Sequence, residues 1–190
     1  MPQHEPAPRV AKLAVVERAL SMMVTRTDTI IETGTGHGDL ACLLRNVFNR
    51  VVTIELSASF VEVRKRLYGT LPKVQTLVGD SRECLPALAR DIREPAVWYL
   101  DAHYCHLRSL PADGDDDVPL MEELAIISAR PQADAVIVDD VHAFNRVRTR
   151  GHPGGGWTGV STASIIKRLG RVRASYNDNG CLVLIRTCET

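Results

Sequence analysis

The sequence predicts an α/β fold in which helices cover both faces of a doubly wound, seven-stranded, mostly parallel sheet. Three observations support this. Short β-branched or apolar runs alternate with helical patterns five times, a glycine-rich turn follows the first run, and Asn179-Gly180 joins the last two runs. Parallel strands need crossover helices, whereas an Asn-Gly turn joins antiparallel strands, so the sheet should close with an antiparallel β-hairpin.

Each element follows from the spacing of its apolar residues. Strands are expected at 28–32, 51–55, 74–78, 96–100, 135–138, 171–176 and 181–186. Helices are expected at 11–23, 39–48, 83–92, 120–128 and 161–169, and from a cap at Ser57 or Ser59 to Tyr68. The glycine-rich segment from Gly151 to Gly159 should be a loop.

The 190 residues suffice for one ordinary domain with a real core. We divide them into an N-terminal tail and helix at 1–27, which pack on the core, and a ligand-binding domain at 28–190. Lys and Arg total 23, as do Asp and Glu, which argues against a nucleic-acid or membrane-surface protein. Five cysteines without a C-x-x-C pair fit reduced thiols in a cytoplasmic protein.

The turn after the first strand reads Glu32-Thr33-Gly34-Thr35-Gly36-His37-Gly38. Glycines allow the backbone to bend sharply and to approach a ligand closely. The spacing is neither the G-x-G-x-x-G of a dinucleotide site nor a P-loop, which ends in a lysine. Glu32 before the glycines suits a cationic or hydrogen-bond-donating group. A tight strand-to-helix connection without a ligand is the alternative.

Carboxylates also end the next two strands. Glu55 lies about 20 residues beyond the glycines, where an acid can accept hydrogen bonds from both hydroxyls of a ribose. Gly79-Asp80-Ser81 ends the third strand, where Asp80 could accept from an adenine amino group. Ligands of open α/β sheets bind outside the carboxyl ends of the strands, so these groups should share one crevice.

Together these features resemble the class I S-adenosylmethionine-dependent methyltransferases, which have a Rossmann-like fold. The matching pieces, in order, are Glu-Thr-Gly-Thr-Gly-His-Gly, Thr-Ile-Glu-Leu-Ser, Gly-Asp-Ser and Leu-Asp-Ala-His-Tyr. The resemblance covers about residues 28–186, including the closing hairpin. It implies that the ribose is bound by Glu55, that the adenine is bordered by Gly79, Asp80 and Ser81, and that the methionine part is approached by Glu32, Thr33, Gly34, Gly36, His37 and Gly38.

Three further carboxylates end the fourth and fifth strands. Asp101 follows strand 96–100, and Asp139 and Asp140 follow strand 135–138. Three oxygen donors on neighbouring strands suit Mg²⁺, which could orient a substrate hydroxyl and lower its pKa. The pattern is similar to metal-dependent O-methyltransferases, which implies Asp101, Asp139 and Asp140 as metal ligands. The alternative is that Asp139 caps the next segment, Asp140 faces solvent, and Asp101 contacts only the cofactor amine or the substrate.

A possible base completes the predicted site. His103 follows Asp101 by two residues, and a neutral imidazole there could accept the proton of an attacking hydroxyl. We therefore expect Asp101 and His103 to be catalytic in methyl transfer from S-adenosylmethionine to a small-molecule hydroxyl, with help from Mg²⁺. Asp101 is also expected to contact the cofactor. A structural role for His103 is the alternative.

Several alternatives to this function stay open. The fold could use S-adenosylmethionine for non-methyl chemistry, or bind it without catalysis. An NAD-dependent oxidoreductase is a further alternative, although the glycine spacing is wrong for it. The short chain leaves either an open site or a lid completed by a partner subunit of a homo-oligomer. The sequence does not decide the substrate, or whether the acceptor is oxygen, nitrogen or carbon.

Overall fold

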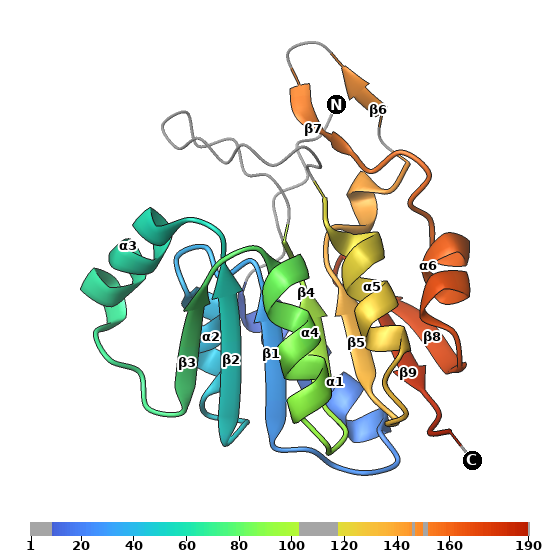
Figure 1. Cartoon of the computed structure of the whole chain (residues 1–190), viewed down its shortest axis with the longest axis horizontal. Helices are drawn as coiled ribbons and strands as arrows, with labels where there is room; N and C mark the ends of the chain where they lie inside the picture. The colour runs from blue at the N-terminus through green and yellow to red at the C-terminus, as the bar shows by residue number, and fades with distance from the viewer. Residues whose placement is uncertain (1–8, 103–117, 146, 150–151, 190) are drawn as a thin grey trace.

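A computed structural model describes residues 9–102, 118–145, 147–149 and 152–189 of the chain (Figure 1). Within them, seven strands form one sheet in the order β3-β2-β1-β4-β5-β9-β8. The strands are β1 (Thr29–Thr33), β2 (Arg50–Glu55), β3 (Val74–Val78), β4 (Val97–Leu100), β5 (Ala135–Val138), β8 (Val172–Asp178) and β9 (Cys181–Arg186). Strands β1 to β5 pair in parallel, and β9 pairs antiparallel with both β5 and β8. The predicted fold class is confirmed.

The described part of the chain has six α-helices, of which α1 precedes the first strand and the others lie between strands in the sequence. They are α1 (Arg9–Met22), α2 (Asp39–Leu44), α3 (Ala58–Tyr68), α4 (Ser81–Asp91), α5 (Leu120–Ser128) and α6 (Thr162–Leu169). Helix α2 ends earlier than the predicted 39–48. The backbone N–H groups of Asn49 and Arg50 both donate to the carbonyl oxygen of Asp28, which turns the chain and begins β2 beside β1.

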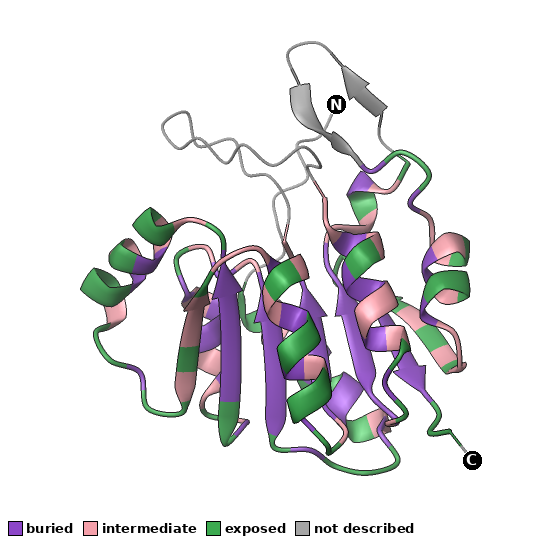
Figure 2. Cartoon of the chain, in the orientation of Figure 1, coloured by how far each residue is buried: buried purple, intermediate pink, exposed green. Residues whose placement is uncertain are grey.

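Helices cover both faces of the sheet, as the buried strands in Figure 2 show. Helices α4, α5 and α6 pack on the face that includes Ile31 and Val136. Helices α1 and α2 pack on the opposite face, which includes Ile30 and Ile137. Adjacent residues of one strand therefore serve different cores, since successive side chains of a strand point to opposite faces.

The predicted loop at 151–159 is wrong in part, because the chain forms a small hairpin there. Strand β6 (Val147–Thr149) pairs antiparallel with β7 (His152–Gly156) in a sheet of its own. The sequence of β7 has neither β-branched residues nor alternation, so only its pairing with β6 makes it a strand. No described helix is long and apolar enough to span a membrane.

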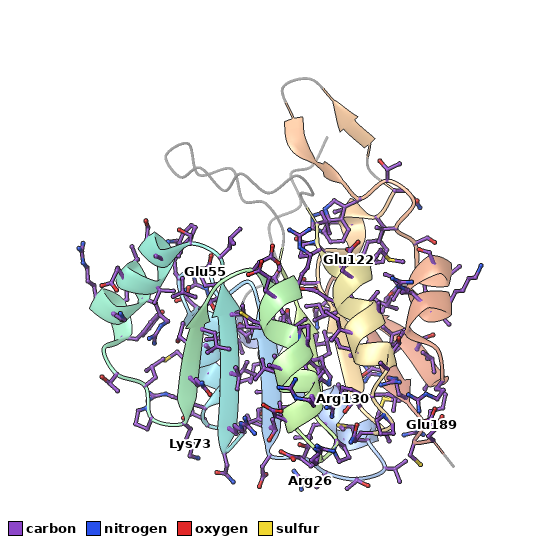
Figure 3. The ribbon with its side chains drawn as sticks, viewed as in Figure 1. Arg26, Glu55, Lys73, Glu122, Arg130 and Glu189 are labelled. Atoms are coloured by element: carbon purple, nitrogen blue, oxygen red, sulfur yellow. The ribbon has the colours of Figure 1, made fainter. Side chains whose placement is uncertain are left out.

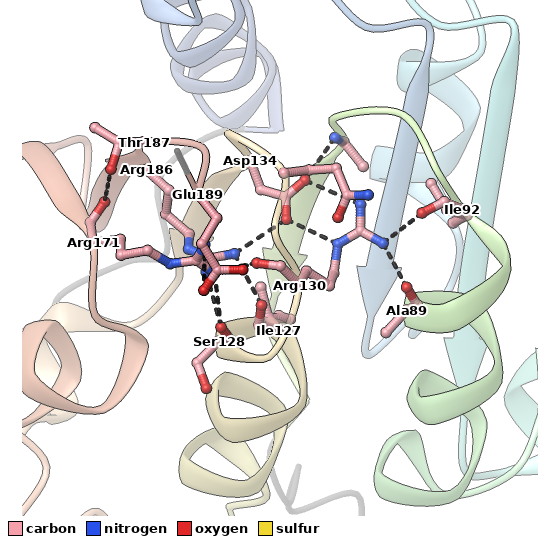
Figure 4. A network of polar contacts seen from close by, with 12 residues as sticks. Ala89, Ile92, Ile127, Ser128, Arg130, Asp134, Arg171, Arg186, Thr187 and Glu189 are labelled. Atoms are coloured by element: carbon pink, nitrogen blue, oxygen red, sulfur yellow. Dashed lines mark hydrogen bonds and ion pairs between the residues drawn. The ribbon is translucent and has the colours of Figure 1, made fainter.

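A buried network of charged residues lies at the end of the sheet opposite the carboxyl ends of the parallel strands (Figure 4). Asp134, fully buried before β5, accepts from Arg130 Nε at 2.9 Å and from the backbone N–H of Ala96 at 2.9 Å. Arg186 of β9 lies 3.3 Å from the same carboxylate and donates to the carbonyl oxygen of Ile127. Burial lowers the pKa of Arg186 to about 10. This value is still well above 7, so Arg186 is charged at neutral pH. The network therefore ties β4, α5 and β9 together.

Candidate functional site

The glycine turn after β1 is held tightly between its neighbouring strands. The backbone N–H of Gly34 donates to the carbonyl oxygen of Ile54 at 2.9 Å, and Gly34 has a φ of 80°. A Cβ at Gly34 would lie 2.4 Å from the backbone oxygen of Asp101. Only glycine fits a position with both this φ and this contact. The turn therefore brings the chain directly against the end of β4.

Glu55 joins the end of β2 to this turn. Its Oε2 accepts from the N–H of Gly36 at 2.8 Å, and its Oε1 accepts from the N–H of Ser57 at 2.9 Å. The side chain is only 8% exposed, and Figure 3 shows Glu55 at the carboxyl end of the sheet. Carboxylate oxygens have further lone pairs, so Glu55 could also accept from ligand hydroxyls. His37 is exposed and packs edge-on against the ring of Phe60.

Glu32 is a buried carboxyl at the end of β1, 2% exposed. Thr53 Oγ1 on β2 donates to its Oε2. Burial raises the pKa of Glu32 to about 8, with Asp101 adding to the shift, although the hydrogen bond from Thr53 opposes it. At neutral pH Glu32 is therefore mostly protonated, and a cation placed beside it would favour its ionised form.

Asp80, which follows β3, already has a structural role within the protein. Asp80 is the N-cap of α4 and accepts from the N–H of Arg82 at 2.8 Å. The guanidinium of Arg82 also donates to both Asp80 oxygens, and this hydrogen bonding lowers the pKa of Asp80. The N–H of Gly79 donates to the carbonyl oxygen of Glu55 at 3.0 Å, and Ser81 is buried. The predicted adenine-facing residues thus lie beside Glu55.

A lysine that sequence analysis missed lies between the predicted metal ligands. The Nζ of Lys12, on α1, forms an ion pair with Asp139 Oδ2 and lies 3.6 Å from Asp101 Oδ2. Burial alone would lower the pKa of Lys12, but the nearby carboxylates of Asp101 and Asp139 raise it above its usual value. Lys12 is therefore a firmly charged cation among these carboxylates.

Asp139 has its oxygens fully engaged in this arrangement. Besides Lys12, its Oδ2 accepts from the Tyr99 hydroxyl at 2.7 Å. Its Oδ1 accepts from the backbone N–H of Asp140 at 2.8 Å and from Cys181 Sγ at 3.5 Å. The charge of Lys12 and these donors hold the pKa of Asp139 below its ordinary value, although burial opposes them.

These contacts do not fit the predicted Mg²⁺ site. In the described part of the chain, no three His, Cys, Asp or Glu side chains are grouped so as to hold a metal ion. Asp140 has left-handed backbone geometry and lies 3.7 Å from His142. An ammonium group occupies the space between Asp101 and Asp139, and its charge would repel a divalent cation. The described residues therefore do not support the assignment of Asp101, Asp139 and Asp140 as metal ligands.

A second buried carboxyl, also missed, lies on the opposite face of the sheet. Glu123 on α5 is 1% exposed, and its two oxygens, like Thr33 Oγ1, have no hydrogen-bond partner among the described residues. Burial raises the pKa of Glu123 to about 7, and the nearby hydroxyls of Ser81 and Thr33, which do not reach hydrogen-bond geometry, offset this only in part. Helical spacing is a signal for its burial, because Glu123 is three residues after Leu120, which is also buried. The predicted base His103 lies outside the described residues.

Solved structures share this architecture. A SAM-dependent methyltransferase from Anabaena variabilis is 14% identical with a TM-score of 0.60, over 94% of this chain and 84% of that one. The N-methyltransferase NodS from Bradyrhizobium japonicum is 13% identical with a TM-score of 0.59, over 95% and 96%. Human methyltransferase-like protein 13, in complex with SAH, is 14% identical with a TM-score of 0.59, over 96% and 83%.

These similarities establish the fold of this chain. The sheet order and the antiparallel strand β9 are those of the class I methyltransferase fold. At such low sequence identity the similarity concerns the fold alone, and function has to be argued from the site. No protein-family model matches the sequence, and no curated protein does either.

Proposed function

We propose that this chain binds S-adenosylmethionine at the carboxyl ends of β1, β2 and β3 and transfers its methyl group to a small-molecule hydroxyl. The observation that carries the proposal is the hydrogen bond from Gly36 N–H to Glu55. It puts an ionisable carboxylate beside a glycine turn at the edge where α/β sheets bind ligands. The solved methyltransferases with the same fold support this assignment.

The residues of the turn fit such a ligand. A Cβ at Gly36 would meet no atom within 4 Å, so there is open space at the tip of the turn. In the proposed complex Glu55 accepts hydrogen bonds from the ribose hydroxyls, and Asp80 with Ser81 borders the adenine. Glu32 faces the amino acid portion, whose ammonium favours the ionised carboxylate. S-adenosylmethionine supplies an electrophilic methyl group when bound.

The acceptor is proposed to bind next to Asp101, at the end of β4. Asp101 is partly exposed there, whereas Asp139 is buried. Much of the rate would come from positioning the hydroxyl in line with the methyl group. His103 stays the proposed base. Mg²⁺ is not part of the proposal, because Lys12 occupies the space between the carboxylates.

Calorimetry with S-adenosylmethionine, S-adenosylhomocysteine and NAD tests the cofactor. We expect both sulfur compounds to bind and NAD not to bind. Binding of NAD alone would support an oxidoreductase and overturn the proposal. Glu62→Gln on α3 is the matched control for variants of the site carboxylates. Glu62 is exposed and, among the described residues, pairs only locally with Lys65.

Product analysis tests the reaction. The protein is incubated with methyl-labelled S-adenosylmethionine and a panel of small hydroxyl compounds, and label is followed into product. We expect labelled product and an equal amount of S-adenosylhomocysteine. Cleavage of the cofactor without methyl transfer would support non-methyl chemistry. Tight binding without turnover across the panel would support a cofactor-binding protein without catalysis.

A further inference from the structure

Helix α1 brings a positive charge to the place where the sequence predicts a metal ion. The side chain of Lys12 extends from this helix to the carboxyl ends of β4 and β5, where it pairs with Asp139 and Asp101. Its side chain is 16% exposed, so the ammonium group is mostly shielded from water. The contacts between α1 and both β5 and β9 hold the helix in this position.

The two carboxylates differ in their exposure and in their distance from Lys12. Asp139 receives hydrogen bonds from Tyr99, Asp140 and Cys181 in addition to the ion pair with Lys12. Asp101 is 22% exposed on its side chain and lies 3.6 Å from Nζ. The ammonium group therefore bridges the buried carboxylate of Asp139 and the partly exposed carboxylate of Asp101. An ammonium has three N–H donors, and these two ion pairs engage at most two of them.

We propose that Lys12 replaces a divalent cation: its ammonium group neutralises Asp101 and Asp139 and provides the positive charge that faces the acceptor oxygen. The native chain then binds no divalent cation between these carboxylates. Removal of the ammonium group takes away the cation that the described residues place between these two carboxylates, and oxygen donors of this kind bind Mg²⁺ or Mn²⁺. The role toward the acceptor rests on the proposed function, but the replacement of the cation does not.

Manganese binding tests the replacement directly and requires no activity. Titration of Mn²⁺, followed by electron paramagnetic resonance, compares the native protein with Lys12→Met and Lys12→Arg. Methionine keeps the length of the side chain without the charge, whereas arginine keeps the charge. We expect Lys12→Met to bind Mn²⁺ at least about tenfold more tightly than the native protein, or about 1.4 kcal/mol. The arginine variant should resemble the native protein.

The double variant Lys12→Met with Asp139→Asn locates the site, since loss of that carboxylate should abolish the gained Mn²⁺ binding. Circular dichroism checks that each variant is folded. A folded Lys12→Met variant with no gain in Mn²⁺ affinity would overturn the proposal. If that variant does not fold, Mn²⁺ titration of the native protein tests the proposal. Mn²⁺ binding by the native protein that Asp139→Asn removes would overturn the proposal. No Mn²⁺ binding by the native protein would support it.

The role toward the acceptor is tested separately by turnover. The native enzyme should be equally active with and without a chelator, and Lys12→Met should raise KM for the acceptor while S-adenosylmethionine binding stays intact. Loss of native activity in chelator, reversed by Mg²⁺, would overturn the inference. If the native chain binds no S-adenosylmethionine, the proposed function fails, but the Mn²⁺ titrations still decide whether Lys12 replaces a cation.

Discussion

Glu55 Oε2 accepts the N–H of Gly36 at 2.8 Å, so one buried carboxylate joins the end of β2 to the turn after β1. The same side chain also accepts from Ser57, at the N-cap of α3. Glu55 therefore fixes the backbone on both sides of the proposed ribose position before any ligand is present. A site arranged in advance loses less conformational freedom on binding.

Glu55→Ala should weaken S-adenosylmethionine binding by at least about tenfold. The variant loses the two hydrogen bonds that hold the turn in place before the ligand binds, so ligand binding must then order the turn. It also loses the proposed contacts to the ribose. Calorimetry measures the change, with Glu62→Gln as the control. An unchanged affinity in a folded Glu55→Ala variant would mean that the ligand does not bind at β2.

Gly34→Ala should destabilise the fold much more than the same change at Gly180. Both glycines have a φ of 80°, so alanine is strained at either position. At Gly180 the new methyl group meets no atom within 4 Å, whereas at Gly34 it would lie 2.4 Å from the backbone oxygen of Asp101. We expect a loss of about 1–2 kcal/mol at Gly180 and at least about 3 kcal/mol at Gly34. Urea denaturation measures both, and equal losses would contradict the close contact.

Asp134→Ala should lower the free energy of unfolding by about 3–5 kcal/mol. The change leaves the buried guanidinium groups of Arg130 and Arg186 without their shared carboxylate. S-adenosylmethionine binding should persist in the folded fraction, because the network lies at the edge opposite Glu55 (Figure 3). Asp91→Ala, which removes an exposed ion pair with Arg90, is the control and should change stability by less than about 1 kcal/mol. Similar losses in both variants would contradict this role of Asp134.

Most of the fold could be predicted from local signals. The runs 74–78, 120–128 and 135–138 match β3, α5 and β5 because their apolar patterns and flanking polar residues are unambiguous. The hairpin of β6 and β7 could not be predicted, since a His-Pro-Gly-Gly-Gly segment has no strand propensity and depends on its partner.

Only those residues of the candidate site that lie at the ends of strands could be predicted from the sequence. Glu32, Gly34 and Glu55 follow directly from strands and turns, so their grouping follows from the parallel sheet. Lys12 and Glu123 reach the strand ends from helices, and sequence spacing does not specify how helices are oriented on a sheet. Both stand at helical spacing from buried apolar neighbours, Val16 and Leu120, which is the signal that could have indicated their burial.

Buried Glu32 should make the protein less stable as the pH rises. Its folded pKa of about 8 lies above the ordinary value of 4.5, so the folded chain holds this proton more tightly than the unfolded chain does. The stability from Glu32 is fully present below pH 4.5 and is lost as the pH rises to about 8. Glu32→Gln cannot ionise and should remove this loss.

Urea denaturation from pH 5 to pH 9 measures this effect in the native protein and in Glu32→Gln. The stability of the variant relative to the native protein should increase by more than about 1.4 kcal/mol over this range, the equivalent of one pKa unit. Glu123→Gln should behave similarly but level off near pH 7. Glu62→Gln is the control, because Glu62 is exposed and the hydrogen bond from Lys65 lowers its pKa instead of raising it. A constant difference between Glu32→Gln and the native protein would mean that Glu32 is ionised throughout.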